Sequence, residues 1–440
     1  MSTDPSRSEK STDPNTPNLK ETPFDQQFKL FAGFDWASDH HDVVAVDARG
    51  KKVIELTFDD DAEGWARLRQ KFLDLAGADL AAVAVAVETC NGPAVERLLE
   101  MGCRVYPLNP KAAQRYRDRK APAGGKSDHL DAWSFGDALR TDGHGWRVLL
   151  SDDPLTQELR ILCRDEVHLI EQRTACVNQL RAALHEYYPA VLAAFEDWTS
   201  EGPWAFVKAF PTPQALVKAG PTRWRKFLHA HKLYRPQTYD DRMKIFIRAD
   251  QFAASPAVTN AKSRLALALV AQLETLAQQL RLYRRAIEEL FDRHPDRDIF
   301  GSLPGAGPKI GPRLLSELGD RRDRFQDPQA LQCMAGSAPL TEQSGKGRWV
   351  HFRAACNKHL RAAVHLWANL TRDGCVWAQT YYQHKRKQGM GHACALRCLA
   401  QRWLKILWKM WQTHTPYDEA LHTRNQVKHG SWNVTIAPQT

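Results

Sequence analysis

Residues 29–58 read KLFAGFDWASDHHDVVAVDARGKKVIELTF, and this stretch decides the fold of the N-terminal part of the chain. It contains three strand-like runs, residues 29–36, 41–47 and 51–58, and a turn at residues 48–50 separates the last two. Runs of this length joined by short turns predict three neighbouring antiparallel strands. Asp35 lies at the end of the first run, so a carboxylate is expected where the first strand ends.

The most apolar stretch of the chain is residues 80–88, LAAVAVAVE. An unbroken apolar run of this length is typical of a central strand that is buried on both faces. Glu88 ends the run, so a second carboxylate is expected at the exit of that strand.

Two further carboxylates, Asp128 and Asp131, lie in residues 126–140, KSDHLDAWSFGDALR. Because they are three positions apart, both project from one face if this segment is helical. Residues 29–150 are therefore predicted to form an α/β domain like ribonuclease H, whose sheet would gather Asp128 and Asp131 with Asp35 and Glu88 beside one phosphate. Four neighbouring acids are expected to be structural or solvated: Asp39, Asp42, Asp47 and Asp137.

Such a cluster of carboxylates predicts a metal site. Two unneutralised carboxylates about 4 Å apart repel by roughly 4 kcal/mol at an effective dielectric constant of about 20, so they must hold cations or be protonated. Ligand sets made only of oxygen favour Mg²⁺ or Mn²⁺. Two such ions roughly 4 Å apart would clamp the attacking and leaving oxygens of a phosphodiester. We therefore predict four metal-binding catalytic residues, Asp35, Glu88, Asp128 and Asp131; the alternative is four solvated surface acids.

The charge of the chain fits a polyanionic partner. The chain has 440 residues, a formal net charge of +10 and a pI of about 9.1. From Asp296 to the end there are 21 Lys and Arg against 10 Asp and Glu, an excess of 11, so the C-terminal third is the expected surface for a nucleic-acid backbone. A second basic segment precedes the helix of Asp128 and is expected to contact substrate, although a solvated face is the alternative: Lys111, Arg115, Arg117, Arg119, Lys120 and Lys126.

Nothing in the sequence predicts export or membrane insertion. The first 28 residues are rich in Ser, Thr, Pro and Asp, which predicts a disordered tail. No apolar run reaches the roughly 18 residues that a membrane-spanning helix needs. The nine cysteines are scattered and never spaced as Cys-x-x-Cys, so we expect reduced thiols in a cytoplasmic protein and no zinc site.

The remainder is predicted to be mainly helical, in two domains. In the first, residues 151–295, two long helices at residues 155–195 and 260–291 flank an insert at residues 197–257. They predict a helical hairpin or coiled coil that joins the two ends of the chain and acts as a dimerisation arm; a packed internal helical pair is the alternative. The second domain is residues 296–440.

This last domain opens with residues 303–320, LPGAGPKIGPRLLSELGD. A glycine-rich turn before a helix presents backbone N–H groups that suit a phosphate, with Lys309 beside them, as in helix-hairpin-helix motifs. A plain turn at a helix start is the alternative. Residues 334–353 are expected to be a loop that contains Ser337 and Ser344, and a helix follows. The basic residues of the loop and the helix, Arg353, Lys358 and Arg361, are expected to bind nucleic acid. The tryptophans of residues 392–412 are expected to form a buried stripe rather than a base-stacking surface.

These motifs carry a family resemblance. Asp35-Trp36, residues 87–92 (VETCNG) and residues 126–132 (KSDHLDA) resemble the DEDD domain of IS110-family transposases, and residues 303–320, 335–339 and 343–345 resemble their C-terminal domain. The resemblance implies a RuvC-like catalytic domain, a helical domain with a nucleophilic serine, and DNA recombination directed by a structured bridge RNA in a homo-oligomer, a dimer or tetramer. By motif position that serine is Ser344, with Ser337 as the rival.

The residues around Ser344 suit this role. Gly345 and Gly347 allow a phosphate to approach the backbone closely, and Lys346 and Arg348 offset its charge. A serine hydroxyl still needs a base or metal to activate it. Three functions stay open from sequence: a metal-assisted serine recombinase, a metal nuclease or Holliday-junction resolvase that uses water, and a silent nucleic-acid-binding remnant of a mobile element.

Overall fold

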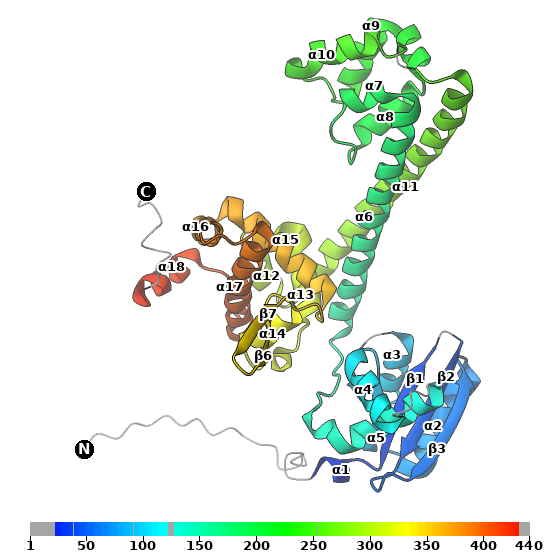
Figure 1. Ribbon diagram of the computed structural model, residues 1–440, viewed down its shortest axis with the longest axis vertical. Coiled ribbons are helices and arrows are strands. Elements are labelled where there is room, and N and C mark those ends of the chain that lie inside the picture. Colours follow the sequence, from blue (N-terminus) through cyan, green and yellow to red (C-terminus); the bar gives the residue numbers. More distant parts are fainter. Residues whose placement is uncertain (1–22, 38, 91, 122–126, 252, 431–440) are drawn as a thin grey trace. The chain divides into compact units, whose positions relative to one another are not determined.

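The computed structural model describes residues 23–37, 39–90, 92–121, 127–251 and 253–430 (Figure 1). The chain divides into two compact units, Met1–Ser151 and Asp152–Thr440. No helix within these described ranges is both long enough and apolar enough to cross a membrane.

The first unit is built on a mixed five-stranded sheet. Its strands are β1 Leu30–Trp36, β2 His40–Val46, β3 Lys52–Asp59, β4 Val83–Val87 and β5 Arg104–Pro107, in the order β3-β2-β1-β4-β5. The first three strands are antiparallel, which confirms the prediction, and β1, β4 and β5 run parallel. The predicted central strand is shorter than expected, because residues Leu80–Ala82 form a 3-10 turn before it.

Helices cover both faces of this sheet. On one face, α2 Ala62–Ala76 and α3 Pro93–Glu100 form a core with the valines of β4. On the other face, α4 Pro110–Lys120 and α5 Asp128–Asp142 form a core with the two alanines of β4, Ala84 and Ala86. Because side chains alternate along a strand, β4 is buried on both sides, as predicted. Its small residues face the side where α5 lies.

The first residues described in the chain are folded. A short helix, α1 Phe24–Gln27, places Phe24 and Phe28 against Phe31 and Tyr106, with ring centroids 5.3–6.2 Å apart within this group. The prediction of a disordered tail over residues 1–28 is therefore wrong for residues 23–28, because two phenylalanines find an apolar surface there. The rest of that predicted tail lies outside the described residues.

The second unit contains a long antiparallel helical pair, α6 Pro154–Tyr187 and α11 Pro256–Arg293 (Figure 1). Glu166 contacts Arg284, whereas Glu186, further along α6, contacts Lys262, which comes earlier in α11. The two helices are therefore antiparallel. The predicted helix over residues 155–195 is interrupted, because Pro189 starts a separate helix, α7 Pro189–Ala194. The pair packs on itself within one chain.

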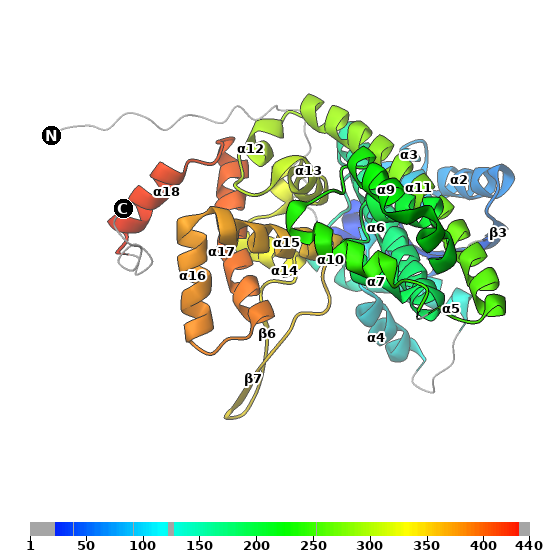
Figure 2. The same ribbon diagram turned by 90° about the horizontal axis from the view of Figure 1, so that it is seen from above.

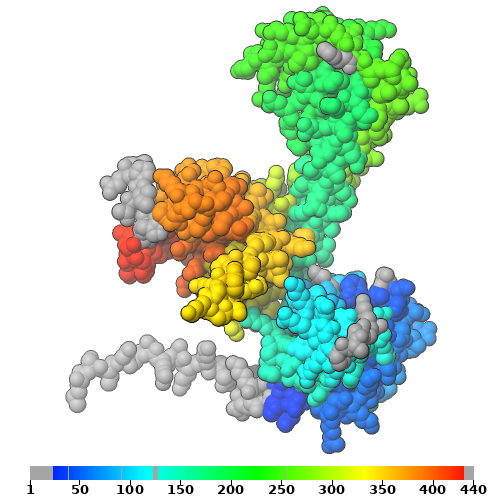
Figure 3. Space-filling view, viewed as in Figure 1, coloured from blue at the N-terminus to red at the C-terminus, as the bar shows by residue number. Residues whose placement is uncertain are grey.

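The insert between these helices forms a small helical head, seen in green in Figure 3. It contains α8 Glu201–Ala209, α9 Pro213–Ala230 and α10 Pro236–Ile247. Buried aromatic side chains make its core, among them Trp204, Phe206, Trp224 and Phe246. The head shares this core with the ends of α6 and α11.

The C-terminal part of the second unit is mainly helical. Its elements are α12 Arg297–Gly301, α13 Gly307–Leu318, η3 Arg322–Arg324, α14 Pro328–Met334, β6 Leu340–Ser344, β7 Gly347–His351, α15 Lys358–Gly374, α16 Val376–Lys387, α17 His392–Thr413 and α18 Glu419–Lys428. Trp403 and Trp411 of α17 are fully buried in the core, as predicted. The segment predicted as a loop contains instead a β-hairpin, β6–β7, which extends away from the helices (Figure 2).

Buried ion pairs join the long helices to this core. The carboxylate of Glu166 on α6 accepts hydrogen bonds from Arg284 on α11 (2.8 Å) and Arg313 on α13 (2.7 Å). Glu317 of α13 accepts from Arg164 of α6 (2.8 and 2.9 Å) and from Asn357 (2.6 Å). Each buried carboxylate is therefore satisfied by partners from two other segments.

Candidate functional site

The four predicted carboxylates come together at one edge of the first unit's sheet. Asp35 lies near the end of β1, and Glu88 directly follows the parallel neighbouring strand β4, whose last residue pairs with Phe34. Asp128 begins α5, and Asp131 lies one turn further along that helix. The charges of all three neighbours act on Asp35.

The proximity of these residues is evident in the acidity of Asp35. The pKa of this carboxyl is raised from 3.8 to about 7, first by burial and then by the charges of Asp131, Asp128, Glu88 and Asp42. Like charges that raise a neighbour's pKa favour either a bound proton or a bound cation at that place. The cluster therefore has the electrostatic character of a cation site.

Asp42 is a fifth carboxylate of this cluster. From sequence, Asp42 is predicted to be structural or solvated, and so is not placed in the site. It is paired directly with Asp35 across β1 and β2 and is buried. The hydroxyl of Thr57 donates a hydrogen bond to it, and Nδ1 of His129 lies 3.5 Å from its Oδ1. The antiparallel pairing of the first two predicted strands was the signal that could have found it.

A histidine also joins the cluster. Potential ligand atoms of His40, Asp42 and Asp128 all lie within 4.8 Å of one another. A hydrogen bond with Asp39, an exposed acid, raises the pKa of His40. Nε2 of His129 contacts a carboxylate oxygen of Glu55 of β3 beside this group. The carboxylates of this donor set suit a divalent cation such as Mg²⁺ or Mn²⁺, whereas the imidazole is a ligand more typical of softer ions such as Zn²⁺.

The helix α5 can approach the sheet closely because two glycines meet. A Cβ atom built on Gly33 of β1 would lie 1.8 Å from the carbonyl oxygen of Ala132, and one on Gly136 of α5 would lie 2.8 Å from the Gly33 nitrogen. Neither side chain could be accommodated without moving the helix. This contact sets how near Asp131 of α5 comes to Asp35 of β1.

Two of the basic residues predicted to contact substrate bind carboxylates of α5 instead. Nη1 of Arg117 lies 2.9 Å from Oδ2 of Asp131, and the Lys120 ammonium pairs with Asp137. These contacts tie α4 to α5, and Asp137 is structural, as expected. The other basic residues of α4, Lys111, Arg115 and Arg119, are exposed. Lys126 lies outside the described residues.

The glycine-rich turn of the second unit lies between α12 and α13, as the helix-hairpin-helix interpretation requires. Gly305 and Gly307 adopt positive φ angles of 71° and 52°, a region that favours glycine. Lys309 is exposed on the first turn of α13.

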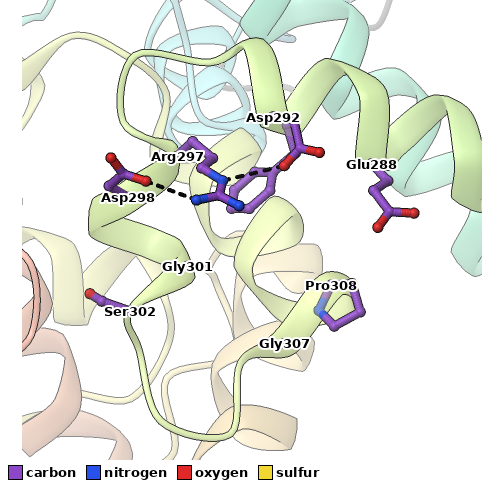
Figure 4. A pocket seen from close by; sticks show the side chains of 9 residues that line it. Glu288, Asp292, Arg297, Asp298, Gly301, Ser302, Gly307 and Pro308 are labelled. Atoms are coloured by element: carbon purple, nitrogen blue, oxygen red, sulfur yellow. Dashed lines mark hydrogen bonds and ion pairs between the residues drawn. The ribbon is translucent and has the colours of Figure 1, made fainter.

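Beside this turn lies a hollow with an acidic lining (Figure 4). Its walls carry the carboxylates of Glu288, Asp292 and Asp298, of which the last two hold Arg297 at 3.3 and 2.9 Å. One cation among three carboxylates leaves this hollow unsuited to a phosphate. Lys309 does not line this hollow.

The two serines of the predicted loop lie in different environments. Ser344 is exposed at the end of β6, beside the turn of the hairpin. Ser337 is only 4% exposed, its hydroxyl donates to the Gln332 carbonyl (3.2 Å), and its own carbonyl accepts from Gln401 (2.6 Å). Of the two hydroxyls, that of Ser344 is the one open to a macromolecular substrate.

The turn next to Ser344 is a two-residue turn. Gly345 has a φ of 56°, whereas Lys346 does not have a positive φ, a pattern that fits a type II′ hairpin turn. Lys346 and Arg348 are exposed on the hairpin, and Lys358 is exposed at the start of α15. Arg353 donates to the Ala338 carbonyl (3.2 Å).

Comparisons with known proteins match both halves of the chain. A transposase family model, that of the DEDD transposases of IS110, matches residues 32–189. A second model, described as transposase IS116/IS110/IS902 family, matches residues 297–383. The first match covers every predicted carboxylate, and the second covers the glycine-rich turn and the hairpin.

Several curated proteins are similar over most of the chain. The mini-circle putative transposase for IS117 of Streptomyces coelicolor is 34% identical over 401 residues, which is 90% of this chain and 97% of that protein. An uncharacterized protein of insertion element IS110 from the same species is 28% identical, over 89% of this chain and 96% of its own. An uncharacterized protein of insertion element IS116 from Streptomyces clavuligerus is 27% identical, over 87% and 94% respectively.

Proposed function

Since the chain belongs to the IS110 family of insertion-sequence transposases, we propose that it cuts and rejoins DNA through a serine nucleophile with the help of divalent metal ions. The observation that carries this proposal is the gathering of four carboxylates around Asp35, which together with burial raises the pKa of Asp35 to about 7. The exposed Ser344 supplies the second half of the chemistry.

The first unit is, in this proposal, a domain of the ribonuclease H and RuvC type. The strand order β3-β2-β1-β4-β5, with three antiparallel strands followed by two parallel ones, supports it. In such a sheet, residues at the ends of β1 and β4 lie side by side. Asp35 and Glu88 occupy these two positions.

Asp35, Glu88, Asp128 and Asp131 would hold the metal, with Asp42 and His40 beside them. Bound Mg²⁺ or Mn²⁺ would supply charge neutralisation for a phosphodiester and would lower the pKa of an attacking hydroxyl. Arg117, which binds Asp131 at 2.9 Å, orients that carboxylate from the α4 side.

In the proposed step, Oγ of Ser344 forms a bond to phosphorus, and the bond between phosphorus and one sugar oxygen breaks. The serine proton passes to a base, and the leaving sugar oxygen takes up a proton. The product is a phosphoserine ester that conserves the phosphodiester bond, so attack by a second DNA end reverses the chemistry and releases the serine. Catalysis requires Ser344 and the carboxylates to meet on the same phosphate.

The proposed partners are DNA and a structured bridge RNA. Exposed basic side chains on α4, on α13 and around the hairpin would contact their backbones: Lys111, Arg115, Arg119, Lys309, Lys346, Arg348 and Lys358. The role of RNA rests on membership of the family. We further propose that α6 and α11 join subunits in a dimer or tetramer, and a sedimentation experiment that finds only monomer with and without nucleic acid would contradict this.

A denaturing gel tests the proposal. Labelled DNA from the element's end, incubated with protein, bridge RNA and Mg²⁺, should give a protein-linked band. The band should be lost in Ser344→Ala and in Asp35→Ala, and it should persist in Ser337→Ala that has folded. A band of equal strength in Ser344→Ala would assign the role to another residue, and cleavage without any linked band would favour the nuclease that uses water.

A further inference from the structure

The β6–β7 hairpin presents two different faces. Residues paired directly across two antiparallel strands point to the same side of the sheet. The pairs Ser344 with Gly347 and Glu342 with Trp349 are two residues apart on each strand, so Ser344 and Trp349 share one face. The pairs Gln343 with Arg348 and Thr341 with Val350 form the opposite face.

The indole of Trp349 lies over Gly347, next to Ser344. A Cβ atom built on Gly347 would lie 2.4 Å from the far edge of the indole ring, so the ring occupies the space that a side chain at position 347 would fill. Gly347 is the direct cross-strand partner of Ser344. The aromatic ring is therefore a neighbour of the Ser344 hydroxyl on the same face.

This ring is exposed, which is unusual for so large an apolar group. Trp349 is 54% exposed, whereas seven tryptophans among the described residues of this unit are each at most 8% exposed: Trp198, Trp204, Trp224, Trp367, Trp377, Trp403 and Trp411. An indole that is 54% exposed in the middle of β7 contributes little to folding. It is positioned to bind something else.

The surroundings select a nucleic acid as that partner. Between Pro328 and Arg372 the chain has six basic residues and a single acidic one, Glu342. The guanidinium groups of Arg361 and Arg397 lie 5.3 and 5.1 Å from the ring centroid of Phe352, which directly follows the hairpin. A surface that combines cations with exposed aromatic rings suits the backbone and the bases of one strand.

We propose that Trp349 stacks on a base next to the scissile phosphate and so holds that phosphate at Ser344. This inference rests on the proposed function, because it assumes that the cleaved strand lies at Ser344. Stacking on an aromatic side chain is independent of base identity, so Trp349 fixes the position of the strand without reading its sequence. Phenylalanine at position 349 should retain much of this action, and alanine should lose it.

The test uses the fluorescence of 2-aminopurine, which stacking quenches. Duplex DNA with the junction between the element's end and its flank carries 2-aminopurine at each position around the junction in turn. The protein carries Ser344→Ala, so no chemistry is needed, and it is used with its bridge RNA. At one position next to the junction we expect quenching that Trp349→Ala abolishes and Trp349→Phe keeps, with binding of the same DNA about 5- to 100-fold weaker in Trp349→Ala.

Val350→Ala is the matched control. Val350 is the next residue, 62% exposed, and lies on the opposite face of the hairpin, so its substitution should leave quenching unchanged. Quenching that is equal in Trp349→Ala, or lost equally in Val350→Ala, overturns the inference. So does a loss of self-association in Trp349→Ala with unchanged fluorescence, which would make this face a protein contact.

The outcome is separable from that of the proposed function. Trp349-dependent quenching together with no covalent adduct in the unsubstituted protein would retain the stacking role and reject Ser344 as nucleophile. If the adduct depends on Ser344 but quenching is the same in Trp349→Ala, only the stacking role is rejected.

Discussion

Asp35 and Asp42 stand directly opposite each other on β1 and β2, so two carboxylates share one cross-strand position at the edge of the sheet. Like charges directly opposite each other destabilise a strand pair. The hydroxyl of Thr57 donates a hydrogen bond to Asp42, and the imidazole of His129 and a carboxylate oxygen of Asp128 also lie near it. A cation bound between Asp35 and Asp42 would offset the repulsion between the two carboxylates.

Asp42 should therefore matter for metal affinity. We expect Asp42→Asn to weaken Mn²⁺ binding about 10- to 100-fold, as measured by titration calorimetry on the full-length protein, because it removes one negative charge next to Asp35. Asp47→Asn is the control, since Asp47 accepts hydrogen bonds from the turn amides of Arg49 and Lys51. Equal affinities in wild type and Asp42→Asn would remove Asp42 from the site.

The stability of the metal-free protein should depend on pH through Asp35. Its pKa is about 7 in the folded protein against an ordinary value of 3.8, so folding favours the protonated form. The resulting stabilisation is fully present below about pH 4 and is lost as the pH rises to about 7. Asp35→Asn mimics the neutral acid, so in the presence of a chelator it should unfold at a higher temperature than wild type above about pH 7.

Magnesium should act against this difference in unfolding temperature between wild type and Asp35→Asn. A cation that binds only the folded protein stabilises it, and Asp35→Asn binds that cation less well. We therefore expect added Mg²⁺ to raise the unfolding temperature of wild type more than that of Asp35→Asn. If the unfolding temperatures of the two proteins depend on pH identically in the presence of a chelator, the neighbouring charges do not raise the pKa of Asp35.

Gly33→Ala should disturb the site without touching a carboxylate. The new methyl group meets the backbone of Ala132, so α5 has to move, at a cost of about 1–3 kcal/mol in the free energy of unfolding. We expect lower stability in denaturant titrations and weaker Mn²⁺ binding together. Gly145→Ala is the control, because nothing lies within 4 Å of the added Cβ there. Unchanged Mn²⁺ binding in Gly33→Ala would show that the contact between β1 and α5 does not determine the geometry of the metal site.

Glu166→Ala should destabilise the second unit. It leaves Arg284 and Arg313 without their shared carboxylate at the junction of three helices, and breaking a buried pair in this way costs about 3–5 kcal/mol. Arg284 is partly exposed, which favours the lower end of that range. The exposed Glu171 on the same helix is the control, and its substitution by alanine should change the denaturation midpoint very little. Equal midpoints for both variants would contradict the prediction.

The strands and two long helices were predictable because their apolar residues repeat with the period of the element. Asp35 and Glu88 are found from sequence for the same reason, since each follows an apolar run. Asp42 was not, because its position depends on the register between two strands rather than on either strand alone. His40 and His129 also enter the site only through that register and through the placement of α5.

The β6–β7 hairpin escaped prediction for another reason. All residues of β6 are exposed, so neither face is buried and no alternation of apolar and polar residues marks the strand. The head formed by the insert has irregularly spaced Trp and Phe residues, which gather in one core only when several short helices pack together. The first helix was hidden in a polar segment, where Phe24 and Phe28 are the apolar residues at the helix.

The meeting of Gly33 and Gly136 also bears on how the site can move. Side chains adapt by changing rotamers, but two main chains in contact have no such freedom. The distance between β1 and α5 therefore behaves as a fixed dimension of the enzyme. Adjustments to different DNA ends must come from torsions of Asp35 and Asp128 and from the segment after β4, where Glu88 is attached to chain that no longer pairs in the sheet.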